Sequence, residues 1–375
     1  MHYYTLGNTG LKVSRLALGT MTFGDDWGWG ADASNARQLF DAYLEAGGNF
    51  IDTADLYTNG NSEKMLGQFI KDTRSRDRTV VATKFSYSAE PGNPNAGGNG
   101  RKNIMRAVEG SLQRLDTDYI DLYILHTWDQ VTPAAEVVRT LDDLVSSGKV
   151  RYVALSDVPA WYAAQAQTIA EERHLEPLCA LQLEYSLVER NIEFEYAPLA
   201  QALGTGIMVW SPLASGLLSG KYKPSQSGGQ SGAEGSGRLA TLAGSDNPAF
   251  NKFTDKNWAI VAELEKVASE LGHSMAQVAV NWVANRPSVA SVLIGATKLH
   301  QLKDNLGALD FEIPAELQQR LDEVSKPETR FPYTFFEPGL QGMITGGATV
   351  GDKPAGYYQP VLVAGEGAGT AASES

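Results

Sequence analysis

Eight short apolar runs, each followed by a longer amphipathic segment, dominate this sequence. The runs are LALG (16–19), FID (50–52), VVATK (80–84), YIDLYILH (119–126), VRYVALS (150–156), CALQLE (179–184), GIMVWS (206–211) and SVLIG (291–295). Nearly continuous apolar strands are typical of parallel sheets that are buried on both faces. Alternation of such strands with helices predicts an α/β fold of the (β/α)8 barrel type, which needs about 250 residues before insertions.

The segments between the runs have the patterns of helices. Residues 34–46 begin at Ser34, a residue type that caps helices, and are followed by two glycines. Residues 102–115 place their apolar side chains on one face. Residues 132–147 carry a proline near the expected first turn and end before a glycine. We therefore expect helices over these three ranges.

Three further segments lie outside the strand–helix alternation. Residues 2–13 contain a GNTG turn between two short extended runs and predict a β-hairpin on the barrel floor. Residues 223–250, with SQSGGQSGAEGSG, predict a long loop after the seventh strand. We expect one barrel domain over residues 1–326, and a partly flexible C-terminal loop and tail over residues 327–375.

Composition narrows the class of protein. The 375 residues carry 31 Lys plus Arg and 44 Asp plus Glu, a formal net charge of −13. This charge argues against a nucleic-acid binder. The single cysteine, Cys179, excludes an internal disulfide framework and fits a reducing cytoplasm. No signal peptide or membrane-spanning apolar run is recognisable, so we expect a cytoplasmic protein.

Polar residues stand where several of the apolar runs end. Asp52, Lys84, His126 and Ser156 each close one run, and Tyr57 follows Asp52 in IDTADLY. The carboxyl ends of barrel strands meet at one mouth, where the active sites of such barrels form. Taken singly, the aspartate could cap a turn, the lysine could be solvated and the histidine could be a core residue. Together they predict one polar site.

The residue types at this site suit reduction of a carbonyl group. A phenol loses its proton only near pH 10, but a nearby ammonium stabilises the phenolate, and a buried carboxylate can hold that ammonium. Asp52 can therefore orient Lys84, and Lys84 can assist Tyr57 in giving a proton to a developing alkoxide. His126 can polarise the same oxygen. A nucleophile–base pair and metal-ligand spacing are both lacking, so we predict no metal site.

Longer motifs around these residues resemble the aldo-keto reductase superfamily. They are IDTADLY (51–57), TK (83–84), DLYILH (121–126), VALSD (153–157), QLEYSLVER (182–190), WSPLASGLLSGKY (210–222) and IGATKLHQLKDN (294–305). The similarity covers roughly residues 2–325 and is closest to the bacterial and potassium-channel-β-like branches. It implies a barrel that binds NADPH across its mouth and carries out catalysis within the same domain.

The resemblance also implies roles for individual residues. Asp52, Tyr57, Lys84 and His126 match the catalytic tetrad, with Tyr57 as general acid or base. Trp210 matches the aromatic residue that stacks on the nicotinamide ring. The implied cofactor contacts, besides Asp52, are Gly19, Thr20, Met21, Ser156, Asp157, Gln182, Trp210, Ser211, Pro212, Leu213, Ser215, Gly216, Lys221, Arg238, Gly295, Thr297, Lys298, Gln301 and Asn305. The small residues suit a phosphate loop, and the last group suits a helix N-terminus.

Three positions depart from the pattern of the family: Asp157, Thr297, and Ile294, which replaces the common proline before Gly295. Asp157 stands where asparagine is usual, and a carboxylate can accept a hydrogen bond from a carboxamide but cannot donate one. Thr297 stands where many relatives have an arginine for the 2′-phosphate, and the adjacent Lys298 offers a point charge instead. We therefore expect NADPH or NADP+ as the cofactor, with NADH left open.

The expected substrate pocket is aromatic. Besides Tyr57 and His126, its predicted residues are Trp27, Trp29, Phe85 and Trp128, and the segment 331–336 adds further aromatic side chains. Apolar walls with few polar groups suit an organic carbonyl compound. Candidates are aldehydes, quinones, sugar-derived ketones and bulky polycyclic keto compounds such as oxidised trichothecenes.

The preferred hypothesis is an NADP(H)-dependent oxidoreductase that reduces an aldehyde or ketone, or oxidises the alcohol. Its expected partner is a small-molecule carbonyl or alcohol, with no nucleic acid and no membrane. Two alternatives stay open. The chain could be an NADPH-binding, redox-sensing subunit with incidental catalysis, or Lys84 could form a Schiff base as in an aldolase. The substrate, the direction of the reaction and the oligomeric state do not follow from the sequence.

Overall fold

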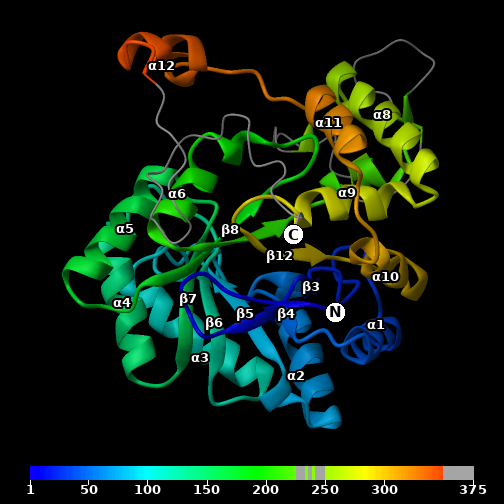
Figure 1. The fold of residues 1–375 in the computed structure, drawn as a ribbon. Coiled ribbons are helices and arrows are strands. Elements are labelled where there is room, and N and C mark those ends of the chain that lie inside the picture. The colour runs from blue at the N-terminus through cyan, green and yellow to red at the C-terminus, as the bar shows by residue number, and fades with distance from the viewer. Residues whose placement is uncertain (225–232, 235–238, 241–249, 349–375) are drawn as a thin grey trace, which may run out of the picture.

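A closed barrel of parallel strands forms the centre of the molecule (Figure 1). The computed structural model describes residues 1–224, 233–234, 239–240 and 250–348. The strands, in the order in which they pair around the barrel, are β12 (Val289–Ile294), β3 (Leu16–Gly19), β4 (Phe50–Asp52), β5 (Val80–Phe85), β6 (Ile120–Leu125), β7 (Val150–Ser156), β8 (Leu178–Glu184) and β9 (Gly206–Trp210). Each strand lies within two residues of its apolar run, and the (β/α)8 prediction is confirmed.

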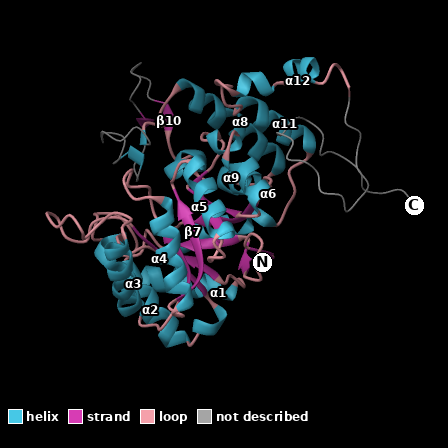
Figure 2. Ribbon diagram, turned by 90° about the vertical axis from the view of Figure 1, so that its left-hand side faces the viewer, coloured by secondary structure: helices cyan, strands magenta, loops and turns pink. Residues whose placement is uncertain are grey.

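Helices surround the barrel strands on the outside, as Figure 2 shows. In the described part of the chain the helices are α1 (Ala33–Glu45), α2 (Asn61–Thr73), α3 (Arg101–Leu115), α4 (Ala134–Ser146), α5 (Ala160–Glu172), α6 (Tyr196–Leu203), α8 (Asp255–Leu271), α9 (Met275–Ala284), α10 (Leu299–Leu306) and α11 (Ala315–Val324), together with α12 (Pro338–Ile344), which lies apart from the barrel (Figure 1). The three expected helices are present, but the prediction that Ser34 caps the first was wrong. Asp32 caps α1, because its Oδ1 accepts the Asn35 N–H at 2.9 Å.

The N-terminal hairpin closes the end of the barrel opposite to the mouth. Strands β1 (Tyr3–Thr5) and β2 (Lys12–Ser14) pair antiparallel, which confirms the predicted hairpin. The Asn8 N–H donates to the carbonyl of Gly204, just before β9 begins, at 2.8 Å. Leu6 and Val13 are fully buried and join the apolar core inside the barrel. The floor is therefore packed with side chains, and chemistry is confined to the other end.

Alternation along the strands decides which side chains enter the barrel. Ala82 on β5 and Leu122 on β6 belong to the inner core, whereas Val81 and Tyr123 belong to the outer core beneath the helices. Successive residues of a strand point to opposite faces. At the mouth end of β5, Lys84 consequently faces the barrel axis and Phe85 faces the helices.

The C-terminal segment leaves the barrel after α11, forms α12 and is described as far as residue 348 (Figure 1). Phe331 and Met343 in this segment are 81% and 78% exposed. The loop after β9 contains the short paired strands β10 (Lys223–Pro224) and β11 (Ala233–Glu234). Arg238, expected to contact the cofactor, lies outside the described residues. In the part of the chain that the structure describes, we find no helix of membrane-spanning length and apolarity.

Candidate active site

The Lys84 ammonium lies at the centre of a buried cluster at the mouth of the barrel. Its Nζ atom donates to Asp52 Oδ1 at 2.5 Å, to the carbonyl of Thr53 at 2.8 Å and to Tyr57 Oη at 3.1 Å. Lys84 and Asp52 are 0% and 1% exposed. Strand β4 supplies the carboxylate, β5 the ammonium and the loop after β4 the phenol. The parallel barrel therefore brings together three residues that the sequence separates by up to 32 positions.

The ion pair keeps the lysine charged in spite of its burial. Burial alone would lower the pKa of Lys84, but the Asp52 carboxylate beside it raises that pKa above its ordinary value. Burial also raises the pKa of Asp52, and the Lys84 charge opposes this effect. The second carboxylate oxygen of Asp52 accepts a hydrogen bond from Gln182 Nε2 at 2.8 Å. An ammonium fixed in this way stabilises negative charge on the Tyr57 oxygen.

Buried hydroxyl groups hold the loop that carries Tyr57. This loop enters a short 3₁₀ turn, Tyr57–Gly60, in which Thr58 has a φ of +46°. The Thr58 hydroxyl donates to the carbonyl of Phe23 at 2.8 Å and accepts the Ser62 N–H at 3.0 Å. Thr20, expected to face the cofactor, is fully buried, and its hydroxyl lies 2.8 Å from that of Ser62. No sequence pattern had singled out Thr58 or Ser62 as positioning residues.

His126 adds a neutral imidazole beside the phenol. It follows β6, and its ring centroid lies 5.8 Å from that of Tyr57. Burial, with a smaller contribution from the Lys84 charge, lowers the pKa of His126 well below its ordinary value. Its Nδ1 atom is buried without a hydrogen-bond partner among the described residues. An imidazole that stays neutral keeps one N–H donor, which is the form required to polarise a carbonyl oxygen.

The next three strands complete the mouth with polar and aromatic groups. Ser156 on β7 and Gln182 on β8 are buried, and Trp210 at the end of β9 is half-buried. The indole N–H of Trp210 donates to Asp157 Oδ1 at 3.1 Å. An indole held by its edge leaves a flat face free to stack on a planar ring. These residues therefore fit the nicotinamide end of the cofactor that the resemblance implies.

The loop after β9 has the geometry of a phosphate cradle. Ser211, Ser215 and Gly216 adopt φ values of +56°, +56° and +93°. A Cβ atom on residue 216 would lie 2.7 Å from Lys221 Nζ, so the glycine leaves room for this ammonium. A glycine turn beside a cation suits an anionic ligand. The loop thus fits a pyrophosphate, and Pro212 and Leu213 lie within it, the former buried and the latter half-buried.

The loop between β12 and α10 presents the other expected cofactor residues. Gly295 is exposed, and a Cβ atom added to it would meet no other atom within 4 Å. Gln301 Oε1 accepts the N–H groups of Thr297 and Lys298 at 3.0 and 3.2 Å. Lys298 is exposed and Asn305 is buried. A cation and the start of a helix fit a phosphate group here. Gly19 and Met21 lie half-buried at the end of β3.

Aromatic rings surround Tyr57 at the mouth, but not all of the expected ones do. The Trp27 ring lies 5.6 Å from that of Trp29 and 6.4 Å from that of Tyr57. Phe85 does not line the mouth. It is fully buried in the outer core, 4.9 Å from the Tyr123 ring, because it follows an inward-facing residue on the same strand.

Two aromatic residues near the mouth were missed by the sequence interpretation. The Tyr87 ring lies 5.0 Å from His126, edge to face. Trp161 is 57% exposed and lies 5.5 Å from the Trp128 ring, so the two indoles form one aromatic wall. The expected contribution of residues 331–336 takes another form, because Tyr333 stacks on Phe194 at 4.8 Å. Trp161 lies in α5 and Tyr333 in a 3₁₀ turn, whereas Tyr87 and Trp128 lie in loops, which strand patterns do not predict.

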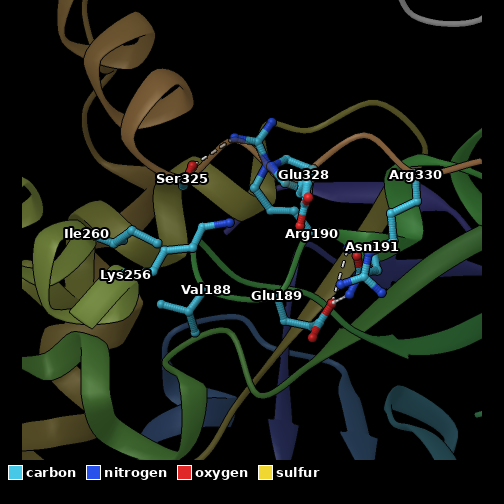
Figure 3. A pocket seen from close by; sticks show the side chains of 10 residues that line it. Val188, Glu189, Arg190, Asn191, Lys256, Ile260, Ser325, Glu328 and Arg330 are labelled. Atoms are coloured by element: carbon cyan, nitrogen blue, oxygen red, sulfur yellow. Dashed lines mark hydrogen bonds between the residues drawn. The ribbon is translucent and has the colours of Figure 1, made fainter. Parts of the chain in front are cut away.

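A separate hollow of about 250 Å³ lies beside the loop after β8 (Figure 3). Arg190 and Lys256 line it, and no tetrad residue does. Arg190 donates to Ser325 Oγ at 2.7 Å, and Lys256 donates to the carbonyl of Lys326 at 3.1 Å. Both of these cations are thus engaged with the protein itself. The hollow therefore lies apart from the cluster around Lys84.

Comparison with known proteins shows the family. Residues 15–326 match the model described as "Aldo/keto reductase family". A rice protein (Oryza sativa subsp. japonica) named "Probable voltage-gated potassium channel subunit beta" is 37% identical over 341 residues, 89% of this chain and 100% of the relative. "Uncharacterized oxidoreductase YrpG" of Bacillus subtilis is 36% identical, over 86% of this chain and 96% of its own. "Aryl-alcohol dehydrogenase [NADP(+)]" of Phanerodontia chrysosporium is 33% identical, over 93% and 90%.

The fold and these matches define an oxidoreductase class built on a (β/α)8 barrel. The chain belongs to the aldo/keto reductase family, and the resemblance inferred from the sequence motifs is confirmed.

Proposed function

We propose that this protein is an NADP(H)-dependent oxidoreductase that interconverts an aldehyde or ketone and the corresponding alcohol. The observation that carries the proposal is the Lys84 ammonium, which bridges the Asp52 carboxylate and the Tyr57 phenol inside the mouth. Family membership and the NADP(+) in the name of the fungal relative support the choice of cofactor.

The four side chains have different roles in the transfer of a proton to the substrate. Tyr57 gives its proton to the carbonyl oxygen of the substrate as that oxygen becomes an alkoxide, and Lys84 stabilises the phenolate left behind. The neutral His126 imidazole donates a hydrogen bond to the same oxygen and fixes its position. A nicotinamide cofactor, when bound, would supply the hydride in this direction and accept it in the other. Trp210, Gln182 and the Gly216 cradle would hold that cofactor.

Replacement of Tyr57 by phenylalanine tests the mechanism. The variant keeps the ring that packs against Trp27 and His126 but loses the hydroxyl. General acid catalysis contributes about 10²–10⁴-fold, so we expect kcat to fall at least about 100-fold with the Kd for NADPH unchanged. Tyr119→Phe is the matched control, since Tyr119 lies at the other end of β6 between Arg76 and Arg151. Near-normal turnover in Tyr57→Phe would refute the proposed role.

The rings around the mouth favour an aryl aldehyde or aryl alcohol as the substrate. Trp27, Tyr57, His126 and Tyr87 form a chain of neighbouring rings with centroids 5.0–6.4 Å apart. Planar aromatic substrates gain stacking contacts in such a site. We expect kcat/KM for benzaldehyde derivatives to exceed that for short aliphatic aldehydes, and Trp27→Ala to reduce this ratio. Equal ratios in the two proteins would remove the argument for aryl substrates.

A second candidate function is a redox-sensing subunit with incidental catalysis. The observation in its favour is the rice relative, which this chain matches over the whole length of that protein. The two functions differ in cofactor exchange and turnover. Tight, slowly exchanging NADPH together with no turnover across aldehydes, ketones and secondary alcohols would favour the second candidate over the first.

A further inference from the structure

Asp157 contributes a carboxylate to the barrel mouth that the mechanism above does not use. Its backbone is left-handed, with a φ of +46°, and is held on both sides. The N–H of Asp157 donates to the carbonyl of Gln182 at 3.3 Å, and its own carbonyl accepts the Trp128 N–H at 3.4 Å. With Oδ1 also accepting the Trp210 indole N–H at 3.1 Å, the carboxylate is fixed at the edge of the indole.

The charged groups that face Asp157 are engaged elsewhere. Glu184 on β8 repels the carboxylate and is itself paired with Lys252 at 2.7 Å. Lys84 on β5 attracts it but is held by Asp52. The remaining groups that face it are the Ser156 hydroxyl at the end of β7 and the phenols of Tyr87 and Tyr196. Among the described residues, no lysine or arginine forms an ion pair with Asp157.

The charge of this carboxylate changes near neutral pH. Although the residue as a whole is exposed at the mouth, the protein around its carboxyl group removes hydrating water and raises the pKa of Asp157 to about 7. Repulsion from Glu184 acts in the same direction, and the Trp210 hydrogen bond opposes it. The carboxylate is consequently ionised at about pH 8.5 and mostly neutral at about pH 5.5.

The position of Asp157 determines whether its charge can act on a hydride donor bound next to the substrate. The reacting carbon of the substrate has to sit beside Tyr57 Oη, where the Trp27 and His126 rings lie 6.4 and 5.8 Å from the phenol ring. Gln182 reaches this position through its hydrogen bond to Asp52, and Trp210 ends the strand next to that of Gln182, with its indole edge held by Asp157. A planar ring placed there lies against the indole whose edge binds Asp157.

We propose that Asp157 selects the redox state of the bound nicotinamide, favouring the positively charged oxidised ring over the neutral reduced ring. The inference rests on the proposed function, because it assumes that a nicotinamide cofactor binds in the mouth. An asparagine here could still accept the Trp210 hydrogen bond but would carry no charge. The carboxylate therefore shifts the bound reaction towards alcohol oxidation, and does so most strongly above neutral pH.

The expected preference is about tenfold, the size for a unit charge a few ångströms away in a mouth partly open to water. Because the two equilibria are linked, the effect is reciprocal. Binding of NADP+ lowers the affinity of Asp157 for its proton by the same factor by which ionisation of Asp157 strengthens NADP+ binding. At about pH 7, a tenfold coupling releases about 0.4 proton for each NADP+ bound. NADPH, which carries the same phosphates, serves as the reference for protons released elsewhere.

The experiment measures binding and proton release rather than turnover. Dissociation constants of NADP+ and NADPH are determined by tryptophan fluorescence at about pH 5.5 and 8.5 for the wild type, Asp157→Asn and Asp157→Glu. Proton release is determined by calorimetry in two buffers of different ionisation enthalpy. We expect the preference of Asp157→Asn for NADP+ over NADPH to be about tenfold smaller than that of the wild type at the higher pH, and little changed at the lower pH. The variant should also lack the additional proton that the wild type releases on binding NADP+ rather than NADPH. Asp157→Glu should retain much of both.

The possible outcomes distinguish failure of this inference from failure of the proposed function. Nucleotide binding with an unchanged NADP+ to NADPH ratio in Asp157→Asn overturns this inference and leaves the proposed function intact. Absence of binding by either nucleotide overturns both. If Asp157→Asn does not fold, equal proton release by NADP+ and NADPH in the wild type still overturns the inference.

Discussion

Replacement of Lys84 by methionine should destabilise the protein in a manner that depends on pH. Methionine retains most of the length and apolar volume of the side chain but removes the charge that neutralises Asp52. The carboxylate is 1% exposed, and its remaining side-chain partner is Gln182 at 2.8 Å. Loss of one partner of a buried ion pair costs about 3–5 kcal/mol, because the other charge stays buried without compensation.

The pH dependence of this destabilisation follows because the folded variant, and not the unfolded chain, gains the proton. Without Lys84, burial should raise the pKa of Asp52 further, so that the folded variant binds a proton that the unfolded chain has lost. An acid with a raised folded-state pKa contributes stability that is lost as the pH rises through that value. The deficit of Lys84→Met should therefore be about 3–5 kcal/mol at about pH 8.5 and smaller at about pH 5.5.

Urea unfolding followed by tryptophan fluorescence measures this deficit at the two pH values. The double variant Asp52→Asn/Lys84→Met is the matched control, since it removes both charges and keeps an amide where Gln182 binds. It should recover about 2 kcal/mol or more relative to Lys84→Met at the higher pH. A Lys84→Met protein that is as stable as the wild type at about pH 8.5, or equally destabilised at both pH values, would show that the pair is not desolvated.

Two further substitutions test the glycine cradle after β9 and the buried Asp55 carboxyl group in the loop that carries Tyr57. Gly216→Ala places a Cβ atom 2.7 Å from Lys221 Nζ at a φ of +93°, so fluorescence titration should show NADPH binding weakened about tenfold. Gly339→Ala, which meets no atom within 4 Å, should bind normally, and equal affinities in the two variants would contradict the cradle. Burial and the nearby Glu63 raise the pKa of Asp55 to about 7, which means that its ionisation opposes folding as the pH rises through that value. The penalty accumulates as the pH rises from the ordinary aspartate pKa near 3.9 to about 7. In urea, the stability of Asp55→Asn relative to the wild type should therefore be greater at about pH 8.5 than at about pH 5, by about 2 kcal/mol, whereas the same difference at both pH values would refute the assignment.

The barrel and the buried cluster around Lys84 could be predicted because they depend on patterns that are local in the chain. Apolar runs of strand length mark the strands, and parallel closure brings the carboxyl ends of those strands to one mouth. Asp52, Lys84 and His126 stand at such ends, so their proximity follows once the barrel is assumed. The outward direction of Phe85 could also have been predicted from the sequence, because this residue follows an inward-facing lysine on the same strand.

Other features were decided only by the tertiary structure. Tyr87 reaches His126 because the chain turns at Ser86, where φ is +138°, and no periodicity predicts the direction of such a turn. The hydroxyl contacts of Thr58 and Ser62 and the pairing of Asp157 with Trp210 join residues far apart in the chain. Strand identity follows from local apolar patterns, whereas the electrostatic surroundings of each group depend on which distant segments pack against it.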